Sequence, residues 1–448
     1  MRTAPGIATG KLLPFVAGVL CRRHAKWLVV ICPALASVNT PALAGTAPVD
    51  TLTGDWNGKR TALAQRGLSV TAMEITETAW DAVSDGPHQV RTVGQFTLTA
   101  TLDTERMFDW PRGKMQMALS RRHGTDLGLA TDPGLLQLPQ ASHGRGDVWR
   151  LAQLWYEQGF AQGSLKLGRM SSAEDFASAP CEFQNLTLCG SAPGHIAPDT
   201  IYNYPIGQWG ARLRWEFSPA FSLALGIYES NADNLGLAHG FSLGFHPGDG
   251  YLKMAEFAWT SRFRDGTTKG TYRIGGWYDN GDATDVAIDA QGGYRALSGL
   301  PGETRNGRSG GFLNVLHWLR APSGTDSGTR LLINGAIADR GSNTLRDKLA
   351  VEVIGPSPVR PTDSIGIGLG TSSVNPHITD SQRAARVAGL RSEPAATREY
   401  VFEVFYGIRP TWARWLELRP NLGVVHHPGG RSDRPTAAIV GLKIFYAL

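Results

Sequence analysis

An alternation of apolar and polar residues with a period of two constrains this chain more than any other feature. It is clearest over residues 209–217, where aromatic and aliphatic residues would share one face and Arg212 and Arg214 the other. Neighbouring residues of a β-strand point to opposite sides, so this segment predicts a strand with one apolar and one polar surface. Similar runs occur at residues 96–103, 400–408 and 442–448. No long segment has the helical period, and the chain is expected to be all-β.

Two all-β architectures are compatible with this alternation. A soluble sandwich buries the apolar faces, whereas a membrane barrel turns them toward lipid and lines its lumen with the polar faces. Arginines and tryptophans are dense within the same strands, and aromatic residues gather near strand ends, as in interfacial girdles. These aromatic residues are Trp110, Trp149, Trp155, Trp209, Trp318, Trp412 and Trp415. The sequence therefore favours a transmembrane antiparallel β-barrel.

Residues 1–44 have the composition of a secretory signal peptide. They contain five of the 44 Lys and Arg residues and none of the 39 Asp and Glu residues, an apolar run at 27–36, and the small-x-small sequence 42–44. The alternative is a membrane anchor, but the run is shorter than the about 20 residues needed to span a bilayer. The rest of the chain has 39 basic and 39 acidic residues, so the basic footprint of a nucleic-acid-binding protein is absent.

The predicted leader divides the chain into three parts. Residues 1–44 are the signal peptide, residues 45–67 a short N-terminal periplasmic segment, and residues 68–448 the barrel. Within the second part, residues 56–67 are expected to form a short helix that ends at Gly67.

Two of the four cysteines remain after the predicted leader. Cys181 and Cys189 are eight residues apart, and in an oxidising compartment such a pair is expected to form a disulfide. The alternative is a metal or redox pair, but the spacing fits neither a CxxC redox motif nor a zinc knuckle.

Motifs of covalent chemistry are weak. Residues 240–244 match the GxSxG pattern of hydrolases, which requires a strand–turn–helix elbow, yet residues 245–250 have the composition of a loop. The chain has 54 glycines, so a chance match is expected. The histidines lack the spacing of metal ligands. We expect no catalysis, no metal and no cofactor.

Several blocks with uncommon residues occur in the order found in one known family. They are residues 52–60, 122–124, 149–158, 167–169, 174–176, 180–190, 202–205, 208–214 and 226–231. The chain resembles the carbohydrate-selective outer-membrane porins. The resemblance implies a barrel of about 16 strands, or about 25 residues per strand and connection, which leaves room for spanning strands of about 9–11 residues.

The resemblance also implies a function and a set of partners. The protein would let monosaccharides or small oligosaccharides diffuse passively across the outer membrane of a Gram-negative bacterium. Its partners would be outer-membrane lipid, lipopolysaccharide and the barrel-assembly machinery, although Leu448 departs from the aromatic last residue usual in such barrels. The sequence leaves monomer and trimer open. Two alternatives are an outer-membrane barrel enzyme of the lipid hydrolase type and a soluble exported carbohydrate-binding β protein.

Selectivity in such a channel depends on the polar groups that line it. Strand parity places Arg212 and Arg214 opposite the apolar face, hence in the lumen, with Glu216 as their expected partner. The full set of candidate channel residues is Arg121, Arg150, Arg169, Glu174, Asp175, Arg212, Arg214 and Glu216. Each could instead be part of a structural ion-pair network in the wall. The Cys181–Cys189 disulfide would fix a loop that folds inward and narrows the pore.

Overall fold

The computed structural model describes residues 50–83, 88–131, 134–246, 250–263, 265–322 and 327–448. All of them belong to one compact unit, Leu43–Leu448. The predicted signal peptide, with Cys21 and Cys32, and the first residues of the predicted N-terminal segment lie outside the described residues.

The described chain forms a closed barrel of 16 antiparallel strands, in which each strand pairs with its sequence neighbours and β1 pairs with β16. The predicted fold class is confirmed. The strands are β1 (Leu68–Val83), β2 (Val90–Asp103), β3 (Gly113–Gly124), β4 (Val148–Phe160), β5 (Gly163–Met170), β6 (Gln208–Glu216), β7 (Phe221–Glu229), β8 (Tyr251–Arg262), β9 (Thr268–Asp289), β10 (Gly302–Arg320), β11 (Thr329–Ala338), β12 (Leu345–Pro356), β13 (Ser364–Val374), β14 (Arg398–Gly407), β15 (Leu416–His426) and β16 (Ala437–Ala447).

Helices are short and lie between strands or before the first one. They are α1 (Lys59–Gln65), α2 (Thr104–Phe108), α3 (Leu127–Thr131), α4 (Ser172–Asp175), α5 (Pro193–Ile196), α6 (Arg295–Ser298) and α7 (Pro376–Val387), with the 3-10 turns η1 (Leu186–Leu188), η2 (Ala232–Leu235), η3 (Leu237–His239) and η4 (Pro428–Gly430). In the part of the chain that the structure describes, no helix has the length and apolar character to cross a membrane. After α1, Gly67 adopts a positive φ of 95°, which turns the chain into β1.

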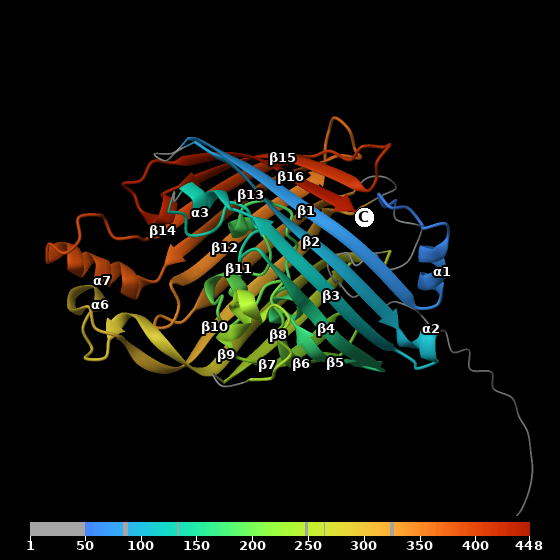
Figure 1. Ribbon diagram of the computed structural model, residues 1–448, viewed down its shortest axis with the longest axis horizontal. Coiled ribbons are helices and arrows are strands. Elements are labelled where there is room, and N and C mark those ends of the chain that lie inside the picture. The colour runs from blue at the N-terminus through green and yellow to red at the C-terminus, as the bar shows by residue number, and fades with distance from the viewer. Residues whose placement is uncertain (1–49, 84–87, 132–133, 247–249, 264, 323–326) are drawn as a thin grey trace, which may run out of the picture. The chain divides into compact units, whose positions relative to one another are not determined.

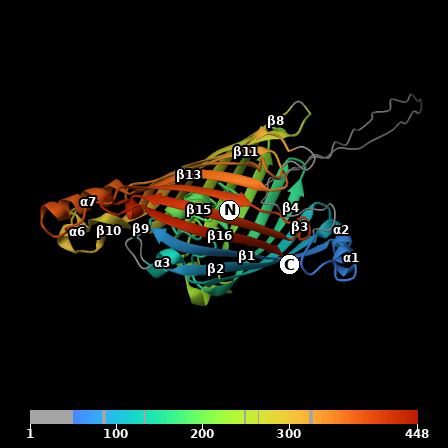
Figure 2. The same cartoon turned by 90° about the horizontal axis from the view of Figure 1, so that it is seen from above.

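The two ends of the barrel differ. The four longest connections, residues 125–147, 171–207, 230–250 and 375–397, all join strands at the same end, which we call the long-loop end. Figures 1 and 2 show α6 and α7 at this end and α1, α2 and the C-terminus at the other, the short-turn end. This asymmetry is typical of outer-membrane barrels, which have short periplasmic turns and longer external loops.

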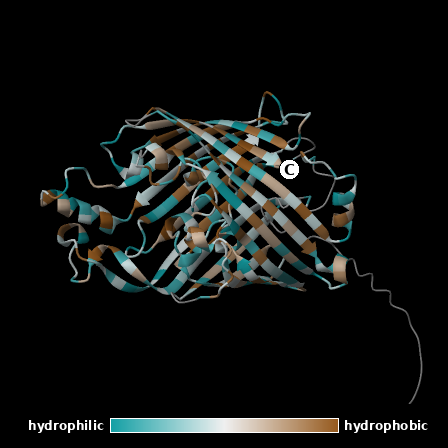
Figure 3. Cartoon of the chain, viewed as in Figure 1, coloured by the Kyte–Doolittle hydropathy of each residue, from teal (hydrophilic) through white to brown (hydrophobic). Residues whose placement is uncertain are grey.

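The two faces of the wall also differ. The outer face is apolar and the inner face polar, as the sequence predicts and opposite to the order in a soluble protein. Large apolar side chains such as Leu167, Leu213 and Ile274 point outward and are 46%, 37% and 61% exposed. The inward positions include buried charges such as Glu77 and Lys443. Figure 3 shows the resulting alternation of hydrophilic and hydrophobic residues along the strands. An apolar outside around a charged inside is the arrangement of a membrane barrel.

Candidate functional site

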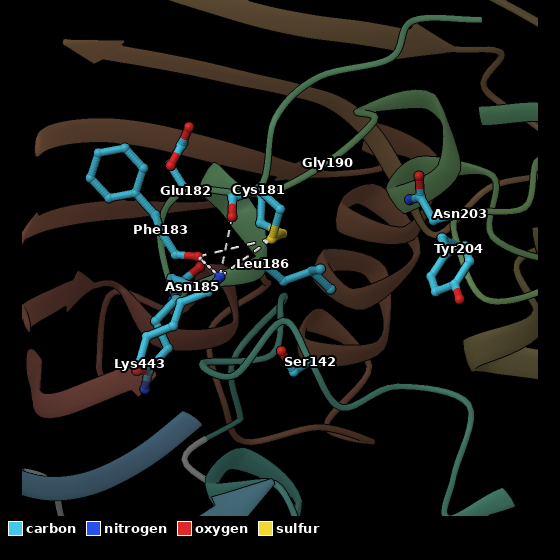
Figure 4. The surroundings of a disulfide bond; sticks show 12 residues. Ser142, Cys181, Glu182, Phe183, Asn185, Leu186, Gly190, Asn203, Tyr204 and Lys443 are labelled. Carbon is cyan, nitrogen blue, oxygen red and sulfur yellow. Dashed lines mark hydrogen bonds between the residues drawn. A yellow bond between two sulfur atoms is a disulfide. The ribbon is translucent and has the colours of Figure 1, made fainter. Parts of the chain in front are cut away.

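One connection enters the interior of the barrel and spans it. Residues 171–207 join β5 to β6 and contain α4, η1 and α5; we call them the crossing segment. Their Cys181 and Cys189 form the predicted disulfide (Figure 4). The crossing segment is held by inward side chains from β5 to β8 on one side and from β11 to β16 on the other.

One attachment of the crossing segment is made by the strand that closes the barrel. Lys443 of β16 donates hydrogen bonds to the carbonyl oxygens of Phe183 at 2.7 Å and Cys181 at 3.3 Å. Its ammonium group also lies 3.0 Å from the carboxylate of Glu77 on β1, and the two side chains are 1% and 0% exposed. Figure 4 shows Lys443 reaching this part of the crossing segment. A single lysine thus joins the first strand, the last strand and the crossing segment.

Glu182, next to the disulfide, is held by two arginines of the wall. Arg419 of β15 lies 2.8 Å from its carboxylate, and Arg330 of β11 forms a second ion pair with it. Burial alone would raise the pKa of Glu182, but Arg419 and Arg330 hold it at about 2. The carboxylate therefore stays ionised.

A carboxylate of the wall fixes the next two residues. Glu403 of β14 accepts hydrogen bonds from the backbone amides of Gln184 and Asn185, both at 2.8 Å. The ring of Phe183 packs edge-on against Phe405 of the same strand, with centroids 5.0 Å apart. The bend at 183–185 is therefore held by charge-assisted hydrogen bonds and by an aromatic contact.

The other side of the barrel holds the start of the crossing segment. Asp175 of α4 lies 2.9 Å from Lys166 of β5 and 3.6 Å from Arg212 of β6, and it accepts a hydrogen bond from Tyr228. Burial alone would raise the pKa of Asp175, but Lys166 and Arg212 keep it below its usual value. Further along, the amide of Ala177 donates to Glu256 of β8 at 2.7 Å.

A second connection, residues 125–147, packs beside the crossing segment. The amide of Ala141 donates to the carbonyl of Gln184, and the amide of Ser142 donates to Glu77, both at 2.8 Å. Asp126 at the start of this connection is fully buried, and burial raises its pKa to about 7. Among the described residues, no group of His, Cys, Asp and Glu side chains is arranged to hold a metal ion.

Arg212 and Arg214 occupy inward positions, because the residues on either side of them, Leu213 and Trp215, lie on the exposed apolar face. The prediction that Glu216 is the partner of Arg212 is wrong. Its guanidinium lies 2.8 Å from Glu157 of β4, in addition to Asp175. Positions four apart on one strand are separated by about 13 Å, whereas inward residues on neighbouring strands lie within reach of each other.

Three more of the candidate residues lie inside the barrel. Glu174 lies inside the barrel and accepts a hydrogen bond from Gln153 of β4. Arg150 and Arg169, 3% and 2% exposed, both donate to Asn234 of η2, so they hold the connection between β7 and β8.

The prediction that the side chain of Arg121 lines the lumen is wrong, because this side chain points outward. It pairs in register with the outward Phe96 and Trp149 and forms an ion pair with Asp147 at 3.0 Å, with 43% of its side chain exposed. The strand parity of β3 turns the adjacent Arg122 inward instead, where it donates to the carbonyl of Tyr204.

For two of the aromatic residues, the prediction that they lie in an outward interfacial girdle is also wrong. Trp155 is 7% exposed and lies against the ammonium of Lys166, 4.4 Å from the ring centroid. A bulge in β4 leaves Ala152 without a partner on β3 and reverses the parity beyond it. Trp318 also faces inward, opposite Arg330 in register. Nothing in the sequence near Ala152 indicates this bulge.

Several residues of the charged network in and around the crossing segment are absent from the sequence-based set. They are Glu77, Glu157, Lys166, Glu182, Glu256, Arg330, Glu403, Arg419 and Lys443. Strand parity alone could have found Lys443, because it lies between the outward Leu442 and Ile444. Its partners could not have been found, since they come from distant parts of the chain.

A closed 16-stranded barrel with an apolar exterior, a charged interior and an inward connection defines a porin-type outer-membrane protein. Residues 87–446 match the family model described as carbohydrate-selective porin, OprB family, and the chain belongs to that family.

Named relatives agree with this assignment. The chain is 33% identical over 409 residues to Porin B of Pseudomonas aeruginosa, which covers 87% of this chain and 90% of that protein. It is 30% identical to the putative porin QuiX of Acinetobacter baylyi, over 88% of this chain and 92% of that protein. The high-pH structure of Pseudomonas putida OprB superposes with a TM-score of 0.84 at 29% identity, over 90% of this chain and 99% of that one.

Proposed function

We propose that this protein lets neutral sugars, monosaccharides or small oligosaccharides, diffuse passively across the outer membrane into the periplasm. The observation that carries the proposal is the inverted wall, apolar outside and polar inside, together with membership of a carbohydrate-selective porin family. The crossing segment supports selectivity, because a connection held across the lumen narrows the path that a solute can take.

The two alternative functions fit these observations less well. A soluble carbohydrate-binding protein would not expose outward rows of Leu, Ile, Phe and Trp on most of its strands. A hydrolase would need Ser242 on a strand–turn–helix elbow. Residues 240–244 lie instead in the connection between β7 and β8 and are followed by a strand.

The proposal includes export and assembly. The leader at residues 1–44 would direct the chain through the inner membrane and be removed. The barrel-assembly machinery would then insert residues 68–448 into the outer membrane, where the outward face would contact lipid and lipopolysaccharide.

Liposome swelling tests the proposal directly. Purified protein is first checked for heat-modifiable mobility on gels, which identifies an assembled barrel. Proteoliposomes should then swell faster in glucose than in an amino acid of equal size, because the selective element recognises polyols. Equal rates would indicate a general pore, and no swelling in either solute would contradict the transport function.

Two arginines of β6 allow a first test of the proposed channel residues. Arg212→Ala removes a group that holds the crossing segment, whereas Arg214→Ala removes an inward cation close to Glu256 and Arg273. Both variants should assemble and show altered glucose swelling, with the larger change for Arg212→Ala. Unchanged swelling in both variants would count against the lumenal role of this strand.

A further inference from the structure

We infer that the sugar path follows a neutral, hydroxyl-bearing stretch of the inner wall on β1, β2 and β3, an inference that rests on the proposed sugar transport. We call this stretch the hydroxyl wall. It consists of the side chains of Ser69, Thr71, Thr97, Thr99, Thr101 and Gln116.

Strand register brings these side chains together. Ser69 of β1 pairs with Thr101 of β2, which pairs with Gln116 of β3. One step further along the same strands, Thr71 pairs with Thr99. Side chains directly opposite each other on neighbouring strands have Cβ atoms about 5 Å apart, so the hydroxyls form a continuous surface.

Their inward orientation follows from residues on the same strands. Glu77, which shares the parity of Ser69 and Thr71, reaches Lys443 and the connection 125–147 inside the barrel. Thr97, which shares the parity of Thr99 and Thr101, accepts a hydrogen bond from Tyr204 of the crossing segment at 3.3 Å. The hydroxyl wall therefore faces the lumen, in the half near the short-turn end.

The hydroxyl wall is accessible, unlike the charged positions that hold the crossing segment. Ser69 and Thr71 are exposed, and Thr99, Thr101 and Gln116 are half-buried. Among the hydrogen bonds between described residues, the hydroxyl wall is joined to the crossing segment through Tyr204 alone. The hydroxyls of Ser69, Thr71 and Thr99 take part in none of these bonds, so they are available to a solute.

Neutral hydroxyls suit a sugar better than the lumenal ion pairs do. Each threonine or serine hydroxyl can donate one hydrogen bond and accept others, which matches the hydroxyls of a polyol. A sugar that bound Arg212 or Glu182 would have to displace existing ion pairs. Hydrogen bonds between neutral groups are weak enough to allow release, and conduction requires several weak sites in succession.

An apolar side chain lies next to the hydroxyl wall on the same inner surface. Met73 follows Thr71 on the same face of β1, pairs with Thr97, and is 39% exposed to the lumen. Its flexible thioether side chain can pack against the C–H face of a sugar ring. Hydroxyls beside an apolar surface match the two kinds of surface that a sugar presents.

Glucose block of the single-channel current measures sugar binding in the lumen independently of net transport. The test variant is the triple Thr71→Val/Thr99→Val/Thr101→Val, which removes three hydroxyls with little change of shape. The half-blocking glucose concentration should rise about two- to tenfold for each hydroxyl that contributes a neutral hydrogen bond. The salt conductance without sugar should stay unchanged, because ions cross without these bonds.

Thr271→Val is the matched control. Thr271 is an inward threonine of β9, but it is 4% exposed, so the same chemical change should leave glucose block unaltered. Thr99→Ser retains the hydroxyl and should behave like the wild type. If the triple variant fails the heat-modifiability check, the single variants Thr99→Val and Thr101→Val test the inference instead. Each should raise the half-blocking glucose concentration about two- to tenfold.

The outcomes separate this inference from the proposed function. No glucose swelling by the wild-type protein would contradict sugar transport itself. Normal swelling by the wild type, with glucose block equal in the valine variants and the wild type, would overturn the hydroxyl wall alone. A parallel loss of salt conductance and glucose block in an assembled variant would also overturn it, because that result indicates a change of pore width.

Discussion

Two stretches of the same inner wall have opposite characters. On β14–β16 and the long-loop half of β1 the inward side chains include buried charges, and Lys443, Glu77 and Glu403 are all bound to the crossing segment, to its neighbour 125–147 or to each other. On the short-turn half of β1 and β2 the inward side chains of Ser69, Thr71, Thr99 and Thr101 are neutral and accessible to solvent. Charge inside this barrel therefore serves mainly to hold polypeptide in place. The comparison separates residues that shape the path from residues that a solute can touch.

Replacing Lys443 should destabilise the charged stretch more than the other substitutions proposed below. Lys443→Met leaves the carboxylate of Glu77 and two carbonyl oxygens buried without their partner. Removal of one member of a buried ion pair costs about 3–5 kcal/mol. We expect the gel shift of the heated barrel to occur at a lower temperature, and the single-channel conductance to rise as the crossing segment loosens.

The double variant Lys443→Met/Glu77→Gln should recover part of the loss, because it leaves no charge unpaired. Lys253→Ala, which removes an exposed lysine of β8, is the control and should behave like the wild type. A Lys443→Met protein with wild-type conductance and heat stability would show that this lysine does not hold the crossing segment.

Glu182→Gln should have a smaller effect on the same readouts. It keeps the shape of the side chain but removes the charge that binds Arg419 and Arg330. Hydrogen bonds to charged groups contribute about 1.5–3 kcal/mol. Conductance noise should increase, whereas Glu303→Gln, at a side chain 49% exposed, should leave the current unaltered. Equal noise in both variants would argue against the role of Glu182.

The smallest expected effect is a pH dependence from Asp126. Because burial raises its pKa to about 7, the packed connection 125–147 holds a proton that an unpacked one releases at its usual pKa of 3.8. The bound proton therefore stabilises the packed connection fully at low pH, and this stabilisation is lost as the pH rises toward and through 7. Protease cleavage within this connection should therefore increase between pH 4 and about 8. Asp126→Asn should flatten this increase, and an identical pH profile in the variant would contradict the assignment.

Strand parity predicted much of the architecture and part of the lumen. The alternation in β6 gave the outward Leu213 and Trp215 and the inward Arg212, and the spacing of Cys181 and Cys189 gave the disulfide. The same reasoning failed at Trp155, because parity holds only while the register is unbroken and a bulge at Ala152 shifts it.

Within each unbroken stretch of strand, the sequence by itself determined which surface is apolar and which is polar, because successive side chains point to opposite faces. The tertiary structure alone decided how the inward charges are paired. Glu77 and Lys443 are far apart in the sequence, and they meet only because β1 pairs with β16 when the barrel closes. The division of the inner wall into bound charges and accessible hydroxyls likewise depends on the path of the crossing segment, which no local pattern specifies.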